Sequence, residues 1–211
     1  TVALSSTATE PVSGAFPLTV TFSEDVTGFE LGDLTVGNGV ASGLTGSGAV
    51  YTATITPSGD GAVTVDVVAD VAADAAGNGN TAAAQFSIEN DGAAPGVSIA
   101  TSVSEPVSGS FPITVTFTED VTGFELGDLT VGNGSASNLA GSGAVYTADI
   151  TPAGDGAVTV DIAADVATDA AGNTNTAATQ FSIESDGSAP GVTLATTASE
   201  PVSGAFEVSL T

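Results

Sequence analysis

The sequence predicts an all-β protein built of tandem immunoglobulin-like β-sandwiches joined end to end. Short runs of alternating apolar and polar residues are separated by Gly, Asp, Asn and Pro, which is typical of strands and turns. The pentapeptide Glu-Pro-Val-Ser-Gly begins at Glu10, Glu105 and Glu200, so the chain repeats every 95 residues. About seven strands in roughly 90 residues favour an immunoglobulin-like sandwich, with a small all-β barrel as the alternative.

Within the first repeat the elements follow in a regular order. The expected strands are 2–4, 16–22, 34–36, a short run near Leu44, 51–55, 63–67 and 86–88. Alternation places Phe16, Leu18 and Val20 on one face of the second strand. Ile55 likewise alternates with threonines in 51–55, and Val63 and Val65 belong to the inward face of 63–67. We expect residues 24–34 to form a loop whose single helical turn directs Phe29 and Leu31 inward. A glycine-rich turn over 57–61 and a long loop over 70–80 separate the last strands.

The repeat also divides the chain into units. We expect one sandwich over residues 1–91, a linker at 92–95, a second sandwich over 96–186, a linker at 187–190 and the first strands of a third repeat over 191–211. Two strands cannot bury a core of their own. The last segment is therefore expected to fray, to pack on the second sandwich or to pair with another chain.

The charge of the chain is entirely negative: 25 acidic residues stand against no Lys, Arg or His. Nucleic acids and anionic membrane surfaces are excluded as partners, because both require basic side chains. No apolar run is long enough to insert into a membrane. Without His, Cys, Lys or Arg, only paired carboxylates or an activated hydroxyl could catalyse a reaction, and the acids lie outside any expected cleft, so we expect no enzyme. We expect a monomer whose partners are the neighbouring repeats of its own chain.

The acids gather where two successive sandwiches meet. Two carboxylates about 5 Å apart repel by roughly 3 kcal/mol at an effective dielectric constant near 20. The strand order places Glu10, Asp60, Glu89 and Asp91 at the end of the first sandwich that faces the second. It places Glu119, Asp120, Asp128, Asp165, Asp169, Asn173 and Asn175 at the facing end of the second. Ca²⁺ binds six to eight oxygen ligands of these kinds, so the sequence predicts calcium at the joint.

Because the sequence repeats, equivalent candidate ligands also stand at the outer ends of the two sandwiches, away from the joint. These are Glu24, Asp25, Asp70 and Asp74 in the first repeat, and Glu105, Asp155 and Asp186 in the second. The alternative is that the acids serve solubility alone. Asp33 and Asp128 are also suited to capping the turn before the following strand, and Asp66 and Asp161 are expected to be solvated.

Three segments resemble a known family: Phe22–Phe29 (FSEDVTGF), Asp33–Val36 (DLTV) and Asp74–Asn78 (DAAGN). They are similar to the bacterial Ig-like repeats of very large surface adhesins, including RTX adhesins exported by type I secretion. The resemblance covers both full repeats. It implies β-sandwiches, Ca²⁺ within and between domains, an extracellular location at the cell surface, and an extender role that holds adhesive domains away from the cell. The segment Glu89–Pro95 also resembles the acidic linker of cadherins, whose Asp-x-Asp and Asp-Arg-Glu signatures are absent here.

A ligand-binding module for a glycan, ice or a protein partner is the alternative function. Sugar sites usually need aromatic platforms, and Tyr51 and Tyr146 stand at inward positions. Ice binding needs a flat threonine-rich face, whereas the outward row Thr52, Thr54 and Thr56 is short, and Asp149 interrupts its second copy. The ligand of the whole protein stays unknown at this point.

Overall fold

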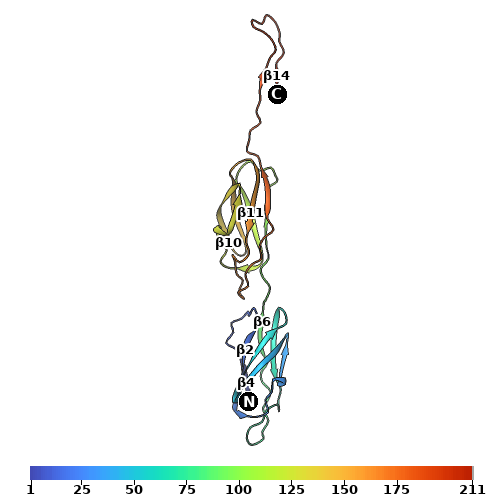
Figure 1. Ribbon diagram of the computed structural model, residues 1–211, viewed down its shortest axis with the longest axis vertical. Helices are drawn as coiled ribbons and strands as arrows, with labels where there is room; N and C mark the ends of the chain where they lie inside the picture. The colour runs from blue at the N-terminus through green and yellow to red at the C-terminus, as the bar shows by residue number, and fades with distance from the viewer. Residues whose placement is uncertain (211) are drawn as a thin grey trace.

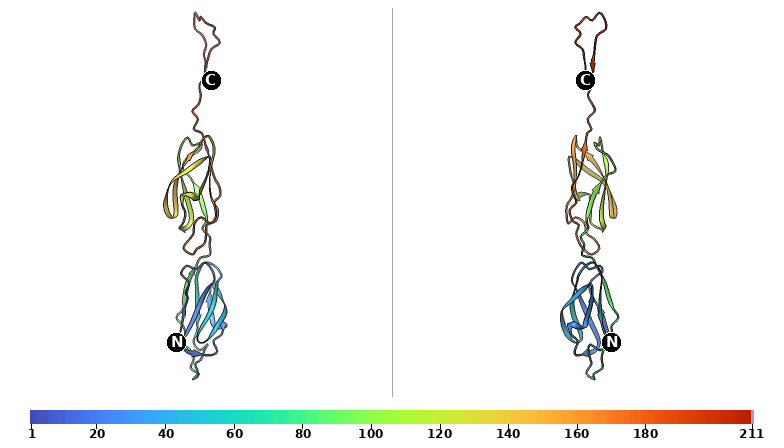
Figure 2. Two further views of the ribbon diagram at one scale, coloured as in Figure 1. Left: turned by 60° about the vertical axis from the view of Figure 1, so that its left-hand side comes forward. Right: turned by 90° about the vertical axis from the view of Figure 1, so that its right-hand side faces the viewer.

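The protein is a rod of two β-sandwiches stacked end to end, followed by a thin C-terminal segment (Figures 1 and 2). The computed structural model describes residues 1–210. The first repeat contains β1 (Val2–Ser5), β2 (Phe16–Val26), the 3₁₀ turn η1 (Leu31–Asp33), β3 (Leu34–Gly37), β4 (Gly39–Pro57), β5 (Gly61–Val67) and β6 (Phe86–Asn90). The second contains β7 (Val97–Ala100), β8 (Phe111–Val121), η2 (Leu126–Asp128), β9 (Leu129–Gly132), β10 (Gly134–Pro152), β11 (Gly156–Ile162) and β12 (Phe181–Ser185). Within residues 1–210 no helix has the length and hydropathy needed to span a membrane.

Each sandwich consists of two antiparallel sheets. In the first repeat the strand orders are β1-β2-β4 and β3-β5-β6, and the second repeat has the same orders in its own strands. The long strand β4 folds back on itself, since the Thr45 and Thr52 hydroxyl oxygens lie 2.9 Å apart. The run expected near Leu44 and the strand over 51–55 are therefore the two halves of β4. This arrangement is that of a constant-type immunoglobulin sandwich.

The inward faces of the two sheets form one hydrophobic core in each repeat. Leu18, Val20, Ile55, Val63 and Val65 are fully buried in the first repeat, as the two-residue alternation predicted. Burying one such side chain contributes about 1.5–3 kcal/mol to folding. A second, separate core forms around the equivalent residues of the second repeat.

The segment between β2 and β3 differs from the prediction at one residue. Phe29 is buried, and its ring packs edge-on against Tyr51 with the ring centroids 5.1 Å apart. Leu31 is 38% exposed, so its inward placement was wrong. The reason is that η1 has only three residues and a hydrogen bond from the Glu30 backbone N–H to Asp33 Oδ2 (2.7 Å) holds it on the surface.

Replacing Asp33 by alanine tests this capping role. The variant loses the acceptor for the Glu30 N–H, and we expect the free energy of unfolding of the first repeat to fall by about 1 kcal/mol. Urea unfolding measures this loss. A loss of calcium affinity with unchanged stability would instead identify Asp33 as a metal ligand.

The C-terminal segment extends away from the second sandwich (Figure 1). It forms a small hairpin in which β13 (Leu194–Ala195) pairs with β14 (Ser209–Leu210). Leu194 is 72% exposed and Leu210 71% exposed, so these strands do not pack on the second repeat. Pairing of this hairpin with another chain stays a prediction.

Candidate metal centre

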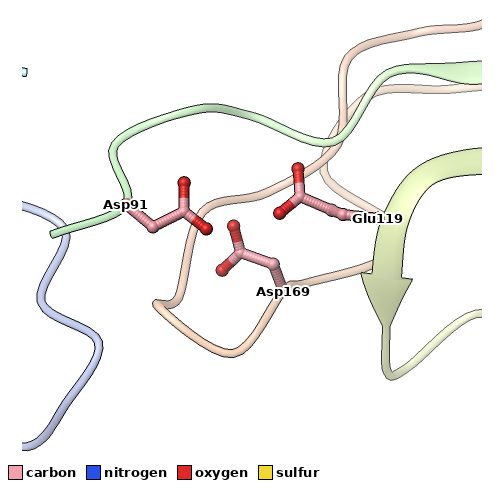
Figure 3. Close-up of side chains that lie close together, drawn as sticks. All are labelled: Asp91, Glu119 and Asp169. Atoms are coloured by element: carbon pink, nitrogen blue, oxygen red, sulfur yellow. The ribbon is translucent and has the colours of Figure 1, made fainter. Parts of the chain in front are cut away.

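Three carboxylates converge where the two repeats meet. Asp91 follows β6 at the start of the linker, Glu119 lies near the end of β8, and Asp169 belongs to the long loop between β11 and β12. One carboxylate oxygen from each lies within 4.8 Å of the others, and the three side chains point toward one another (Figure 3). Among residues 1–210 this is the one group of three such side chains with that spacing. The two repeats thus contribute carboxylates to a single cluster.

The electrostatics of this group are unfavourable on their own. Asp169 is buried, and Asp91 and Glu119 are half-buried. Burial raises the pKa of the Glu119 carboxyl, and the negative charges of Asp91 and Asp169 raise it further. The chain has no Lys, Arg or His to neutralise them. The site therefore holds an excess of negative charge that a bound cation would remove.

The loop that carries Asp169 is ordered by two asparagine side chains. Asn173 donates from its backbone N–H to Asp169 Oδ1 (2.9 Å) and from Nδ2 to Asp169 Oδ2 (2.8 Å). Asn175 is only 2% exposed. Its Oδ1 accepts hydrogen bonds from the backbone N–H groups of Val166 and Ala167, and its Nδ2 donates to two backbone carbonyls. These bonds fix Asp169 in place before any ligand binds.

The first repeat holds the start of the linker from the other side. Glu10 Oε1 accepts a hydrogen bond from the Glu89 N–H (2.7 Å), and Asp60 Oδ1 accepts one from the Gly92 N–H (2.7 Å). Glu10, Asp60 and Glu89 lie outside the group of three carboxylates. Asp60 is still close enough for its charge to contribute to the raised pKa of Glu119.

Three further candidates in the second repeat are not brought into the group. Asp120 follows Glu119 in the part of β8 where the pairing register with β10 shifts. Its side chain lies against Gly143, where a Cβ atom would be 2.8 Å from Asp120 Oδ1. Asp165 accepts a hydrogen bond from the Thr174 hydroxyl within its own loop. Asp128 accepts from the Glu125 N–H (2.7 Å), as the capping alternative predicted.

The outer end of the first repeat carries the equivalents Glu24, Asp25, Asp70 and Asp74. Asp74 Oδ1 accepts hydrogen bonds from the backbone N–H groups of Ala76 (2.8 Å) and Asn78 (2.9 Å). The Asn78 side chain, which donates to Oδ2, is the largest cause of the lowered pKa of Asp74. No third carboxylate closes a group at this end among the described residues.

The far end of the second repeat is similar. Glu105 accepts from the Glu184 N–H (3.0 Å), and Asp186 accepts from the Ser188 N–H (3.1 Å). The Ser188 hydroxyl and the Gly187 N–H donate to Asp155, and they lower the pKa of its carboxyl. Within residues 1–210 these acids also belong to no group of three carboxylates.

The sequence reasoning missed the structural role of the buried asparagines. Asn175 was grouped with the acids at the end of the second repeat, whereas its side chain serves only backbone groups of its own loop. The first repeat shows the same pattern at Asn80, whose Oδ1 accepts from two backbone N–H groups. The signal was the Asn-x-Asn spacing that recurs at Asn78 and Asn173.

The solved structures to which this chain is similar share little of its sequence. Comparison with curated proteins gives no match. Among solved structures, the chain is similar to invasin, described as a bacterial integrin-binding protein, at 16% identity and a TM-score of 0.40, over 76% of this chain and 36% of that one. It is also similar to the adhesin InvE of Yersinia pseudotuberculosis, at 16% identity and a TM-score of 0.30, over 88% of this chain and 58% of that one. The chain thus spans well under two thirds of either structure.

A family match covers both repeats. The family described as the bacterial Ig-like domain matches residues 1–89 and again residues 91–185. The two matches together cover most of the 211 residues and meet close to Asp91, the first residue of the joint. The chain therefore belongs to the bacterial Ig-like domain family, of which it contains two tandem members.

Proposed function

We propose that these repeats are a spacer of a large bacterial surface adhesin and that Ca²⁺ stiffens the joint between them. The observation that carries the proposal is the convergence of Asp91, from the end of the first repeat, with Glu119 and Asp169 of the second repeat, in a chain without basic side chains. The role is mechanical. The rod holds adhesive domains away from the cell, outside which millimolar Ca²⁺ is available. Export by a type I system and a place among the RTX adhesins are part of the same proposal.

Calcium suits this group better than a smaller or softer cation. The ligands are oxygen atoms only, since the chain has no Cys and no His. Ca²⁺ accepts six to eight oxygens in loose geometry, so carbonyl groups and water complete what three carboxylates begin. Mg²⁺ demands a stricter octahedral arrangement at shorter distances.

The magnitudes favour a joint that depends on the ion. Each pair of carboxylates at about 5 Å costs roughly 3 kcal/mol at an effective dielectric constant near 20. A cation present at 100 times its dissociation constant stabilises the bound state by about 2.7 kcal/mol, a free energy that already includes the relief of this repulsion. The linker should therefore be straight with calcium and bent or mobile without it.

Small-angle X-ray scattering in calcium and in chelator tests the proposal. With calcium we expect a large maximum dimension and a narrow distribution of inter-repeat distances. In chelator we expect a shorter mean dimension, because repulsion opens the joint and the repeats move independently. Sodium added to the same ionic strength is the control for screening. Identical scattering in calcium and chelator would contradict the spacer mechanism.

A further inference from the structure

The joint contains contacts that involve no carboxylate of the linker. Asn173 Nδ2 donates a hydrogen bond to the backbone carbonyl oxygen of Asp91 (2.8 Å). The Thr176 N–H donates to the backbone carbonyl oxygen of Pro95 (2.9 Å). Pro95 itself is buried, whereas its equivalent Pro190 is exposed. The loop between β11 and β12 thus contacts the backbone at both ends of the linker.

The orientation of the Asn173 amide decides what this side chain can do. Its NH₂ group carries two hydrogens, and it faces two acceptors: Asp169 Oδ2 and the Asp91 carbonyl oxygen, each 2.8 Å away. An amide nitrogen is a donor and has no lone pair available for a metal. Ligation of Ca²⁺ would require Oδ1 to face the carboxylates instead. The sequence grouped Asn173 with the ligands, and the geometry gives it a different role.

We propose that Asn173 is a positioning residue that ties the loop of the second repeat to the linker and thereby sets the separation of Asp91 and Asp169. The metal part of this inference rests on the proposed function. The two hydrogen bonds themselves require no cation, because the donor is neutral and both acceptors belong to the chain.

The first repeat shows that the loop forms without a joint. Asn78 makes the same two bonds to Asp74, from the backbone N–H (2.9 Å) and from Nδ2 (2.8 Å), although no linker lies beside it in the described residues. The bond to a linker carbonyl is therefore an addition to a preformed loop. Asn78 is a matched control, because changing it disturbs an equivalent loop and leaves the joint alone.

The strength of its hydrogen bonds, set against the repulsion between the carboxylates, decides when Asn173 can hold the two repeats in one arrangement. A neutral hydrogen bond contributes about 1 kcal/mol, which is less than the roughly 3 kcal/mol of repulsion between two carboxylates at about 5 Å. Asn173 alone therefore cannot keep three charged carboxylates together. Once a cation binds, or once Asp91 and Glu119 are both made neutral so that Asp169 is the one charged member of the three, the hydrogen bonds are sufficient to select one arrangement of the repeats.

Spin-label distances between the repeats measure this directly. The chain has no cysteine, so Thr52→Cys and Thr147→Cys, both at exposed positions, give one label in each repeat. In calcium we expect Asn173→Asp and Asn173→Ala to broaden the distance distribution alike, because both remove the donor. A ligand role predicts the opposite for Asn173→Asp, which offers calcium a carboxylate and would keep the narrow distribution. Asn78→Asp should leave the distribution unchanged.

A second arm of the experiment measures the same spin-label distances without any cation. In the doubly substituted Asp91→Asn, Glu119→Gln protein in chelator, we expect a narrow distribution that Asn173→Ala broadens and Asn78→Ala does not. A narrow distribution in this background both with and without Asn173, or a broad one before Asn173 is changed, would overturn the positioning role. If calcium titration of the parent protein shows no binding while this arm gives the expected result, the proposed function fails and the role of Asn173 stands.

Discussion

Replacing Asn175 by alanine is expected to lower the free energy of unfolding of the second repeat by about 4 kcal/mol, because several buried backbone groups lose their partners. The side chain is 2% exposed and serves four of them: the N–H groups of Val166 and Ala167, and two carbonyl groups. Partial entry of water keeps the loss below the sum of four separate penalties. For a domain of this size, such a loss lowers the melting temperature by about 20 °C.

Calorimetry resolves this effect, because the two repeats of the variant then unfold at different temperatures. In Asn175→Ala the second repeat should unfold first, and the first repeat should keep its transition. Asn80→Ala should give the mirror result, because Asn80 makes the equivalent bonds in the first repeat. Gln180→Ala, which removes an exposed hydrogen bond to Asp161, is the surface control. A loss below about 1 kcal/mol in Asn175→Ala would mean that water replaces the side chain at little cost.

Replacing Asp91 by asparagine is expected to weaken calcium binding at the joint by at least about tenfold, a loss of about 1.4 kcal/mol. The change keeps the shape of the side chain and removes one of three converging charges. It also leaves the Asp91 carbonyl oxygen available to Asn173. Isothermal titration calorimetry with Ca²⁺ measures the affinity, and scattering on the same samples reports the stiffness of the rod.

Asp186→Asn is the matched control for this variant. Asp186 occupies the equivalent linker position, and among the described residues it belongs to no group of three carboxylates. Its replacement should leave the tight calcium site and the shape of the two-repeat rod unchanged. Equal losses of affinity in the two variants would show that calcium responds to the net charge of the chain and not to the joint.

The sequence predicted the sandwiches well because the alternation that identifies each strand is a local pattern in the chain. Alternation along β2 and β5 identified buried residues such as Leu18 and Val65 without knowledge of their partners. Leu31 was misplaced because a turn of three residues has no periodicity that tells inside from outside. The fold-back of β4 follows from its glycines and from pairing across the hairpin, and neither gives a strong pattern in the sequence.

The joint was less predictable, because its geometry depends on the direction of each side chain. Composition and repeat spacing placed a large group of acids at one joint, and the structure brings three of them together. Glu119 and Asp120 could not be separated by alternation, because the pairing register of β8 shifts between Thr116 and Val121. The donor orientation of Asn173 could not be predicted either, since it follows from a contact with a linker 82 residues earlier in the chain.

Each repeat has both halves of the joint. A segment with an aspartate follows its last strand at one end, and a loop ordered by an asparagine lies at the other end. Any unit can consequently follow any other without a new junction having to evolve. Gene duplication or deletion of whole units changes the reach of such a protein in steps of one unit, and every intermediate length keeps compatible neighbours.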